Sequence, residues 1–299
     1  METSELIKRV RKIEIKTKGL SKHLFSGEYH SAFKGRGMSF SEVRDYQFGD
    51  DVRNIDWNVT ARYNTPFVKV FEEERELTVM LIIDISQSAF FGTVRQFKNQ
   101  VITEIAAVIA FSANNNNDKV GLILFSDKVE KYIAPKKGRS HILRIIRELV
   151  NFEPTGKATD LSTALQFFNN TQKKRSVTFI LSDFMTSGYD DGLKIASKRH
   201  DMIGLHIYDP REVKLPRNIG LILAQDAETG QTRWIDTGSK RERKQYKAYF
   251  YENQAKFQNT FMKSGADTLS IAIPEKAELE KNDQFYVKDL LRFFKKRKK

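Results

Sequence analysis

The chain has 299 residues, of which 40% are hydrophobic and 11% aromatic, and its formal net charge is +13. This length suits one large domain or one domain with an appendage. There is no cysteine in the sequence, which excludes disulfide scaffolds, thiolate zinc sites and cysteine nucleophiles. The positive charge favours anionic partners, which are nucleic acid, acidic protein surfaces or anionic lipid.

The first residues, METSELIKRVRKIEIKTKG, are basic and lack the apolar core of a signal peptide. The longest apolar runs, such as Val79–Ile83 and Ile105–Phe111, are too short to cross a bilayer. The sequence therefore predicts no transmembrane segment and a cytoplasmic protein.

Residues 1–75 are charged and aromatic and have no long periodic pattern. We expect a short basic helix over residues 6–18, ended by Gly19, then loops, turns and a short strand at Pro66–Phe71. We interpret the stretch RDYQFGDDVRNIDW as a clip of ion pairs and aromatic packing that fastens this segment to the rest of the chain, because large groups such as Trp57 usually find a core. The alternative is a docking surface for a partner.

From Leu77 onward, apolar runs alternate with segments of helical periodicity. The predicted strands cover residues 79–85, 119–126, 129–134, 176–181, 202–208 and 268–273, and the predicted helices cover 95–112, 142–150, 160–169, 189–200 and 239–264. Residues 219–236 predict a hairpin that turns at 228–230. This alternation predicts an α/β fold with a Rossmann-like, doubly wound, mostly parallel sheet and an irregular N-terminal extension.

Three regions follow from this pattern: an N-terminal segment over residues 1–75, the α/β domain over 76–275 and a basic C-terminal helix and tail over 276–299. In the last region we expect a helix that docks Leu290, Leu291 and Phe294 and leaves a charged tip in solvent. Contact of this tip with anionic lipid or nucleic acid is the alternative.

Oxygen-bearing side chains follow the first predicted buried strand. Asp84, Ser86 and Ser88 alternate along the chain where this strand ends, and a carboxylate buried there needs a cation or a donor. Ligands of doubly wound sheets bind at the carboxyl ends of strands, and such oxygen ligands suit a hard cation like Mg²⁺. The alternative is a helix-capping cluster, because Asp and Ser are good caps.

Two further segments match this cluster. The turn GKATD leads into a helix and presents Thr159, and the strand SVTFILSDF ends at Asp183. Asp160 is better suited to cap the following helix than to bind a metal. Together, the three segments predict a metal site built from oxygen ligands.

These motifs resemble the metal-ion-dependent adhesion site of von Willebrand factor A-type domains. The resemblance implies that Asp84, Ser86 and Ser88 hold the metal directly or through water, and that Thr159 and Asp183 complete its shell. The implied cofactor is Mg²⁺, or Mn²⁺ or Ca²⁺, with one coordination position open for an acidic side chain of a partner.

The segment from about Gly27 to Asp183, strongest over RDYQFGDDVRNIDW, resembles the bacterial domain-of-unknown-function family fifty-eight. Genes of that family often accompany MoxR-type AAA+ ATPases, and many members have membrane-spanning segments that this sequence does not show. The resemblance implies a protein partner, either such an ATPase or an acidic client, and a role in assembly or maturation of other proteins.

We therefore expect a metal-dependent protein-binding module that is not an enzyme. The five histidines show no metal-ligand spacing, and the nucleophile elbow GxSxG does not occur. A binder of anionic surfaces is the alternative function. Nucleic acid is the less favoured partner, because we find no basic platform interleaved with aromatic residues, whereas peripheral membrane contact through the basic C-terminus stays open.

Overall fold

The computed structural model describes residues 8, 10–15, 38–73, 76–86, 98–156, 158–217, 219–225, 231–274 and 284–297. The chain forms two compact units, one from Phe33–Leu77 and one from Met1–Ala32 together with Thr78–Lys299. We call them the small unit and the main unit and describe each by itself.

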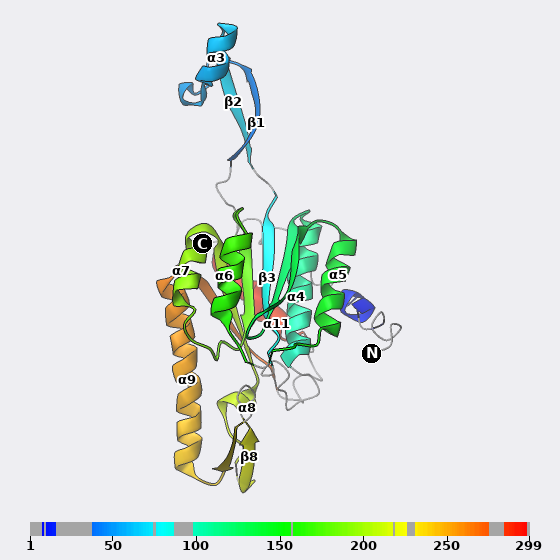
Figure 1. Ribbon diagram of the computed structural model, residues 1–299, viewed down its shortest axis with the longest axis vertical. Coiled ribbons are helices and arrows are strands. Elements are labelled where there is room, and N and C mark those ends of the chain that lie inside the picture. Colours follow the sequence, from blue (N-terminus) through cyan, green and yellow to red (C-terminus); the bar gives the residue numbers. More distant parts are fainter. Residues whose placement is uncertain are drawn as a thin grey trace. The chain divides into compact units, whose positions relative to one another are not determined.

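The main unit is built on a six-stranded sheet (Figure 1). Its strand order is β10 (Asp267–Ala272), β7 (Asp201–Tyr208), β6 (Val177–Ser182), β3 (Thr78–Asp84), β4 (Lys119–Phe125) and β5 (Val129–Lys136). All neighbouring strands pair in parallel except β4 and β5, which are antiparallel. The predicted doubly wound, mostly parallel α/β sheet is confirmed.

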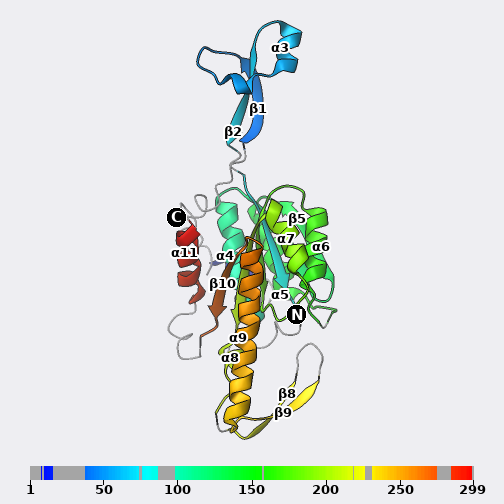
Figure 2. The same cartoon turned by 90° about the vertical axis from the view of Figure 1, so that its left-hand side faces the viewer.

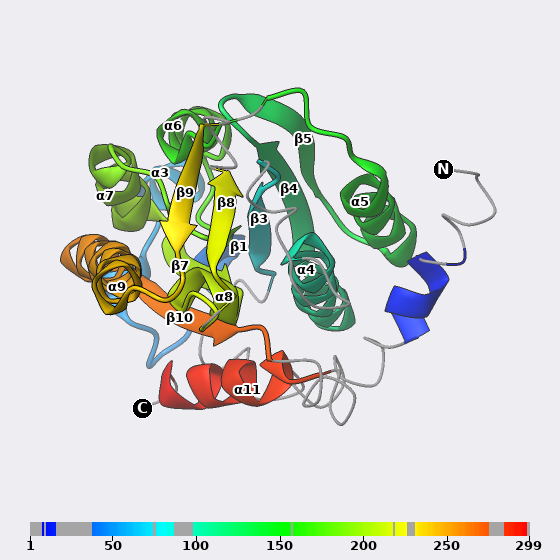
Figure 3. The same ribbon diagram turned by 90° about the horizontal axis from the view of Figure 1, so that it is seen from below.

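Helices cover both faces of this sheet (Figure 3). On one side lie α4 (Lys98–Asn115), α5 (Arg139–Asn151) and α11 (Tyr286–Arg297), and on the other lie α6 (Leu161–Thr171), α7 (Asp190–Arg199) and α9 (Lys240–Lys263). The central strand β3 is apolar from Val79 to Ile83 because both of its faces are covered, and these residues are buried. Burial of these strands and of the facing helices forms the core.

The long helix α9 packs closely on the sheet, beside β10 in Figure 2. The contact is made at Gly204 of β7, where a Cβ would lie 2.6 Å from a ring carbon of Phe261 and 2.8 Å from one of Phe257. Any larger residue at this position would push the helix away from the strand.

Between β7 and α9 the chain forms α8 (Pro210–Val213) and a hairpin of β8 (Leu221–Gln225) and β9 (Thr232–Asp236). The hairpin confirms the prediction, whereas its expected turn at 228–230 lies outside the described residues. The sequence analysis missed α8. Asp209 begins it with a capping box, in which its side chain accepts from the Arg211 amide and its own amide donates to Glu212.

At the C-terminus, α11 buries Tyr286, Leu290, Phe293 and Phe294. Leu290 and Phe294 are fully buried as predicted, whereas Leu291 is only half-buried; Phe293, which the prediction did not include, is buried too. Near the N-terminus, residues 10–15 are helical, within the helix expected over 6–18. None of the helices in the described ranges is long and apolar enough to cross a membrane.

The small unit consists of an antiparallel ribbon, β1 (Met38–Asp45) with β2 (Phe67–Glu73), and the short helices η1 (Val52–Asn54) and α3 (Trp57–Tyr63). The strand expected at Pro66–Phe71 corresponds to β2, whereas β1 and α3 were expected to be irregular. Local caps explain α3: Asp56 accepts from the Asn58 and Val59 amides, and Asn64 ends the helix in a left-handed conformation, with φ of 54°.

The ion pairs of the expected clip are present within this unit. Arg44 binds Asp50 through two hydrogen bonds of 2.7 and 2.8 Å. Trp57, however, is 69% exposed, so the expectation that it finds a core is not met inside the small unit. Docking of this unit on the main one stays a prediction.

Candidate functional site

The predicted site lies at the switch point of the sheet. From β3 the chain continues to β4 on one side and later returns to β6 on the other, so the carboxyl ends of β3 and β6 meet there. Asp84 is the last residue of β3 and Asp183 directly follows β6. Both carboxylates are buried, and each comes from a strand whose apolar residues hold it in place.

Asp84 is held by two neighbours. Its Oδ1 atom accepts a hydrogen bond of 2.9 Å from the Ser86 amide, and its Oδ2 atom accepts one of 2.7 Å from the Ser182 hydroxyl. Burial, reinforced by the negative charge of Asp183, nevertheless raises the pKa of Asp84 to about 6, against the opposing effect of these hydrogen bonds. The hydrogen bonds to the ionised Asp84 carboxylate therefore do not offset the cost of burying its charge. Ser88, the remaining predicted ligand of this loop, lies outside the described residues.

A sharp backbone turn fixes the direction of Asp183. Phe184, the next residue, has φ of 52°, a left-handed conformation that is strained for a bulky side chain. Its ring is buried and stacks on Phe257 with centroids 4.1 Å apart, and its amide donates to the Ser182 hydroxyl. The packing of Phe184 against α9 therefore stabilises this strained backbone conformation next to the Asp183 carboxylate.

Glu130 anchors the turn that precedes Thr159. Its carboxylate accepts hydrogen bonds from the amides of Thr155 and Gly156, at 3.1 and 2.8 Å, and from the hydroxyls of Thr155 and Ser126, at 2.8 and 2.7 Å. Partial burial alone would raise the pKa of Glu130, but these hydrogen bonds lower it. The carboxylate thus ties the turn to the end of β4.

Thr159 follows this turn, with its backbone carbonyl accepting from the Thr186 hydroxyl at 3.1 Å. The turn therefore meets the loop that follows β6. The Oγ1 atom of Thr159 is buried and has no hydrogen-bond partner among the residues that the structure describes. Such an orphaned polar atom is unfavourable by about 1–3 kcal/mol unless a ligand or water satisfies it. The neighbouring Asp160 caps α6, as expected.

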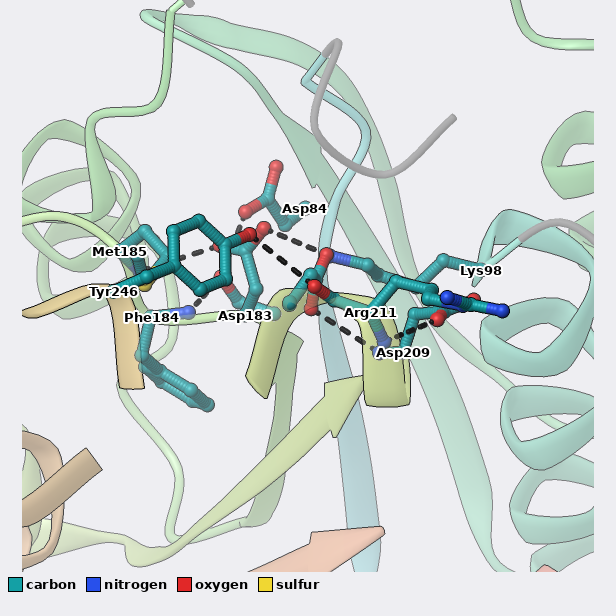
Figure 4. A network of polar contacts seen from close by, with 10 residues as sticks. Asp84, Lys98, Asp183, Phe184, Met185, Asp209, Arg211 and Tyr246 are labelled. Carbon is teal, nitrogen blue, oxygen red and sulfur yellow. Dashed lines mark hydrogen bonds and ion pairs between the residues drawn. The ribbon is translucent and has the colours of Figure 1, made fainter. Parts of the chain in front are cut away.

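The sequence analysis missed a buried lysine at this site. Lys98, the first residue of α4, is 1% exposed, and its Nζ atom lies 3.1 Å from Asp183 Oδ2 and 2.5 Å from Glu212 Oε1 (Figure 4). Burial on its own lowers the pKa of Lys98, but the attraction of Asp183 and Glu212 outweighs it and raises the pKa. Burial likewise raises the pKa of Glu212, although Lys98 opposes this. A single lysine in an amphipathic segment carries no sequence signal of burial.

Several features of the site thus fit a cation. Asp84, Asp183 and Glu212 bring three carboxylates, and Lys98 brings one ammonium group. When all are ionised, two negative charges remain. No three acidic or histidine side chains of the described part converge as ligands of one metal ion. A cation here would therefore depend on two carboxylates, Asp84 and Asp183, with hydroxyl and water oxygens completing its shell.

Comparison with known proteins places the chain in a family. The family model for "Protein of unknown function DUF58" matches residues 42–256. The chain belongs to the DUF58 family. The match begins later and extends further than the resemblance seen in the sequence, which ended at Asp183.

Relatives of this DUF58 chain occur in mycobacteria. The uncharacterized protein Rv1480 of Mycobacterium tuberculosis is 30% identical over 236 residues, which cover 78% of this chain and 74% of that protein. The uncharacterized protein MAV169 of Mycobacterium avium is 29% identical over 170 residues, which cover 56% and 94%.

Solved structures similar to the DUF58 chain include the SpRpn10 VWA domain, with a TM-score of 0.39 and 12% identity over 73% of this chain and 95% of that one. BatB from Bacteroides thetaiotaomicron has a TM-score of 0.42 and 14% identity, with 72% and 99% covered. A von Willebrand factor type A protein from Catenulispora acidiphila has a TM-score of 0.40 and 9% identity, with 78% and 44% covered.

His206, whose pKa Asp183 influences, is a core residue of the DUF58 chain. His206 is buried in β7 and contacts the rings of Phe250 and Phe257, with centroids 5.9 and 5.6 Å away. Burial lowers its pKa to about 4, so the ring is neutral at pH 7.

Proposed function

We propose that this DUF58 chain is a protein-interaction module whose partner binds through a divalent cation. Asp84, Ser86, Ser88, Thr159 and Asp183 would hold the cation, which is Mg²⁺ in this proposal, with Mn²⁺ and Ca²⁺ as alternatives. The cation would supply a positive charge with an open coordination position, and a carboxylate of the partner would fill that position. The chain would bind and would not catalyse.

Two observations carry this proposal: the surplus of negative charge among the buried groups Asp84, Asp183, Glu212 and Lys98, and the unpartnered hydroxyl of Thr159, whose backbone carbonyl is bound to the loop after β6. Thr159 Oγ1 is buried without a hydrogen-bond partner among the described residues, and the ionised site has two more negative than positive charges. A divalent cation would balance the two charges and coordinate the hydroxyl. A purely structural cluster would be expected to pair each of these groups internally.

For the partner, we propose a MoxR-type AAA+ ATPase or an acidic client, with the pair acting in assembly or maturation of other proteins. This step rests on the family resemblance alone. The positive net charge of the chain, +13, agrees with an acidic partner surface.

The test of the cation compares Asp183→Asn with Asp160→Asn as a matched control, because Asp160 caps α6 and stands beside the site. Thermal unfolding is measured with chelator and with millimolar Mg²⁺ or Mn²⁺. We expect the wild type and Asp160→Asn to gain stability from the cation, and the control should keep its helix cap, because asparagine caps a helix about as well as aspartate. Asp183→Asn should gain none. Equal gains in all three proteins would contradict the cation site.

The test of the partner keeps Mg²⁺ present throughout, because an AAA+ ATPase needs it for its own nucleotide. A purified MoxR-type ATPase is titrated with the wild type, Asp183→Asn and Asp160→Asn. Binding by the wild type and the control, with loss in Asp183→Asn, is the expected result. Equal binding by all three would show that the partner does not use the cation.

One observation favours the alternative, binding to an anionic surface. Lys288, Arg292 and Lys295 of α11, with Val287 and Leu291, line an open cavity of about 550 Å³. The buried residues of α11 face the sheet and cannot insert into a bilayer while the helix is docked. Contact would therefore be electrostatic. Steep weakening of binding with salt, unaffected by chelator, would support this function over the first.

A further inference from the structure

Lys98 connects the candidate cation site to α8. The buried ammonium lies 3.1 Å from one oxygen of Asp183, and the other oxygen of that carboxylate accepts from the Met185 amide at 3.2 Å. Both oxygens of the carboxylate are therefore engaged already. A cation that binds Asp183 must share this carboxylate with Lys98 or displace the lysine.

Glu212 offers Lys98 a second place to bind. Its Oε1 atom lies 2.5 Å from the ammonium, and its Oε2 atom accepts from the Asp209 amide in the capping box of α8. A further hydrogen bond of 3.3 Å, from the Tyr246 hydroxyl to the Arg211 carbonyl, ties α8 to α9. Because α8 holds Glu212 in place, Lys98 can leave Asp183 without losing all of its charge compensation.

We propose that Lys98 is a built-in counter-cation that competes with the divalent cation for Asp183, and that Glu212 sets the strength of this competition by drawing the lysine away. Lys98 is a positioning residue, not a metal ligand. In the cation-free protein it neutralises Asp183 and preserves the site. In the loaded protein it repels the cation and keeps its affinity moderate. This inference rests on the proposed cation site.

The competition predicts opposite effects for two neighbouring substitutions. Lys98→Met removes the competing charge and raises the surplus of negative charge from two to three, so the cation should bind at least about tenfold more tightly. In Glu212→Gln, Asp183 is the carboxylate of this pair that still binds the Lys98 ammonium. The ammonium then competes more strongly for Asp183, so the cation should bind more weakly by a similar factor. A structural role alone would make both variants less stable and would not give affinity changes of opposite sign.

The experiment is calorimetric titration of the full chain with Mn²⁺ and with Mg²⁺, together with thermal unfolding in chelator. Lys98→Arg is the conservative variant and should bind within a few-fold of the wild type, because it keeps the charge. The double variant Lys98→Met/Glu212→Gln removes one positive and one negative charge together. It keeps the wild-type surplus of two, and it should still bind more tightly than Glu212→Gln alone. This comparison also serves if the single change Lys98→Met prevents folding.

The outcomes separate the two hypotheses. Tighter binding on removal of Lys98, with weaker binding in Glu212→Gln, supports the competition. This inference is overturned if the wild type binds the cation and removal of Lys98 leaves the affinity equal or lower, both in the wild-type chain and in Glu212→Gln. The proposed cation site would then still stand. Absence of binding by the wild type and by every variant overturns the cation site and the inference together.

Discussion

Asp84→Asn should stabilise the cation-free protein at neutral pH. Burial and the charge of Asp183 raise the pKa of Asp84 from its ordinary 3.8 to about 6, which corresponds to roughly 3 kcal/mol. A carboxyl with a raised pKa destabilises the folded state when it is ionised. The penalty is absent below about pH 4, grows between pH 4 and 6, and is complete above pH 6. Asparagine avoids it but weakens one hydrogen bond, by about 1 kcal/mol, so a net gain of about 1–3 kcal/mol remains at pH 8.

The assay is denaturant unfolding of the wild type and Asp84→Asn in chelator between pH 4 and 8. The free-energy difference should be near zero or unfavourable to the variant at pH 4 and should turn in its favour through pH 5–6. Added Mg²⁺ should reverse the order at pH 8 when it is supplied at about a thousand times the dissociation constant, because only the wild type then gains binding energy, about 4 kcal/mol. A variant that is less stable by the same amount at every pH, with or without Mg²⁺, would refute this reasoning and favour a simple structural hydrogen bond.

Three further predictions concern other parts of the chain. Glu130→Gln should lower stability by about 1–2 kcal/mol and weaken cation binding, because it loosens the turn before Thr159, and unchanged calorimetric affinity would contradict this. Gly204→Ala should cost about 1–3 kcal/mol, measured by thermal unfolding, because α9 cannot approach β7 as closely. The small unit should pack on the main unit, because Val68 is its one fully buried apolar side chain among residues 42–70. Limited proteolysis that releases a stable fragment 76–299 with an unchanged melting temperature would refute this last expectation.

Most of the main unit could be predicted, because the burial of each strand or helix determines where apolar residues stand along it. A strand such as β3, covered on both faces, must be apolar throughout, and its end is visible where Asp84 interrupts the run. The amphipathic helices between the strands show the matching periodicity. The small unit lacks both signals: β1 and α3 depend on local caps and on pairing between segments more than twenty residues apart.

The site could be predicted only in part. Asp84 and Asp183 stand at the ends of the paired strands β3 and β6, so the topology brings these two carboxylates together. Thr159 follows a turn that is bound to the loop after β6. Lys98 and Glu212 gave no such signal. Lysine and glutamate side chains are usually solvated, and the contact between Lys98 and Glu212 depends on where the capping box places α8. Long-range ion pairing of this kind is not encoded in any local pattern.

The arrangement of charge at this site is difficult to explain by stability alone. Replacing a buried ion network by apolar residues is often neutral or stabilising. Here the network is not even balanced, since Asp183 and Glu212 share the Lys98 ammonium and Asp84 adds a third buried carboxylate. A left-handed Phe184 adds strain beside Asp183, and the Thr159 hydroxyl adds an unpaired donor. Each of these features weakens the cation-free fold, and each would be relieved or used if a divalent cation bound between Asp84 and Asp183. Strained backbone and buried carboxylates with shifted pKa values are frequent where proteins bind ligands, and Phe184, Asp84 and Asp183 bring them together at the switch point. This is the physical reason to propose that this end of the sheet binds a ligand.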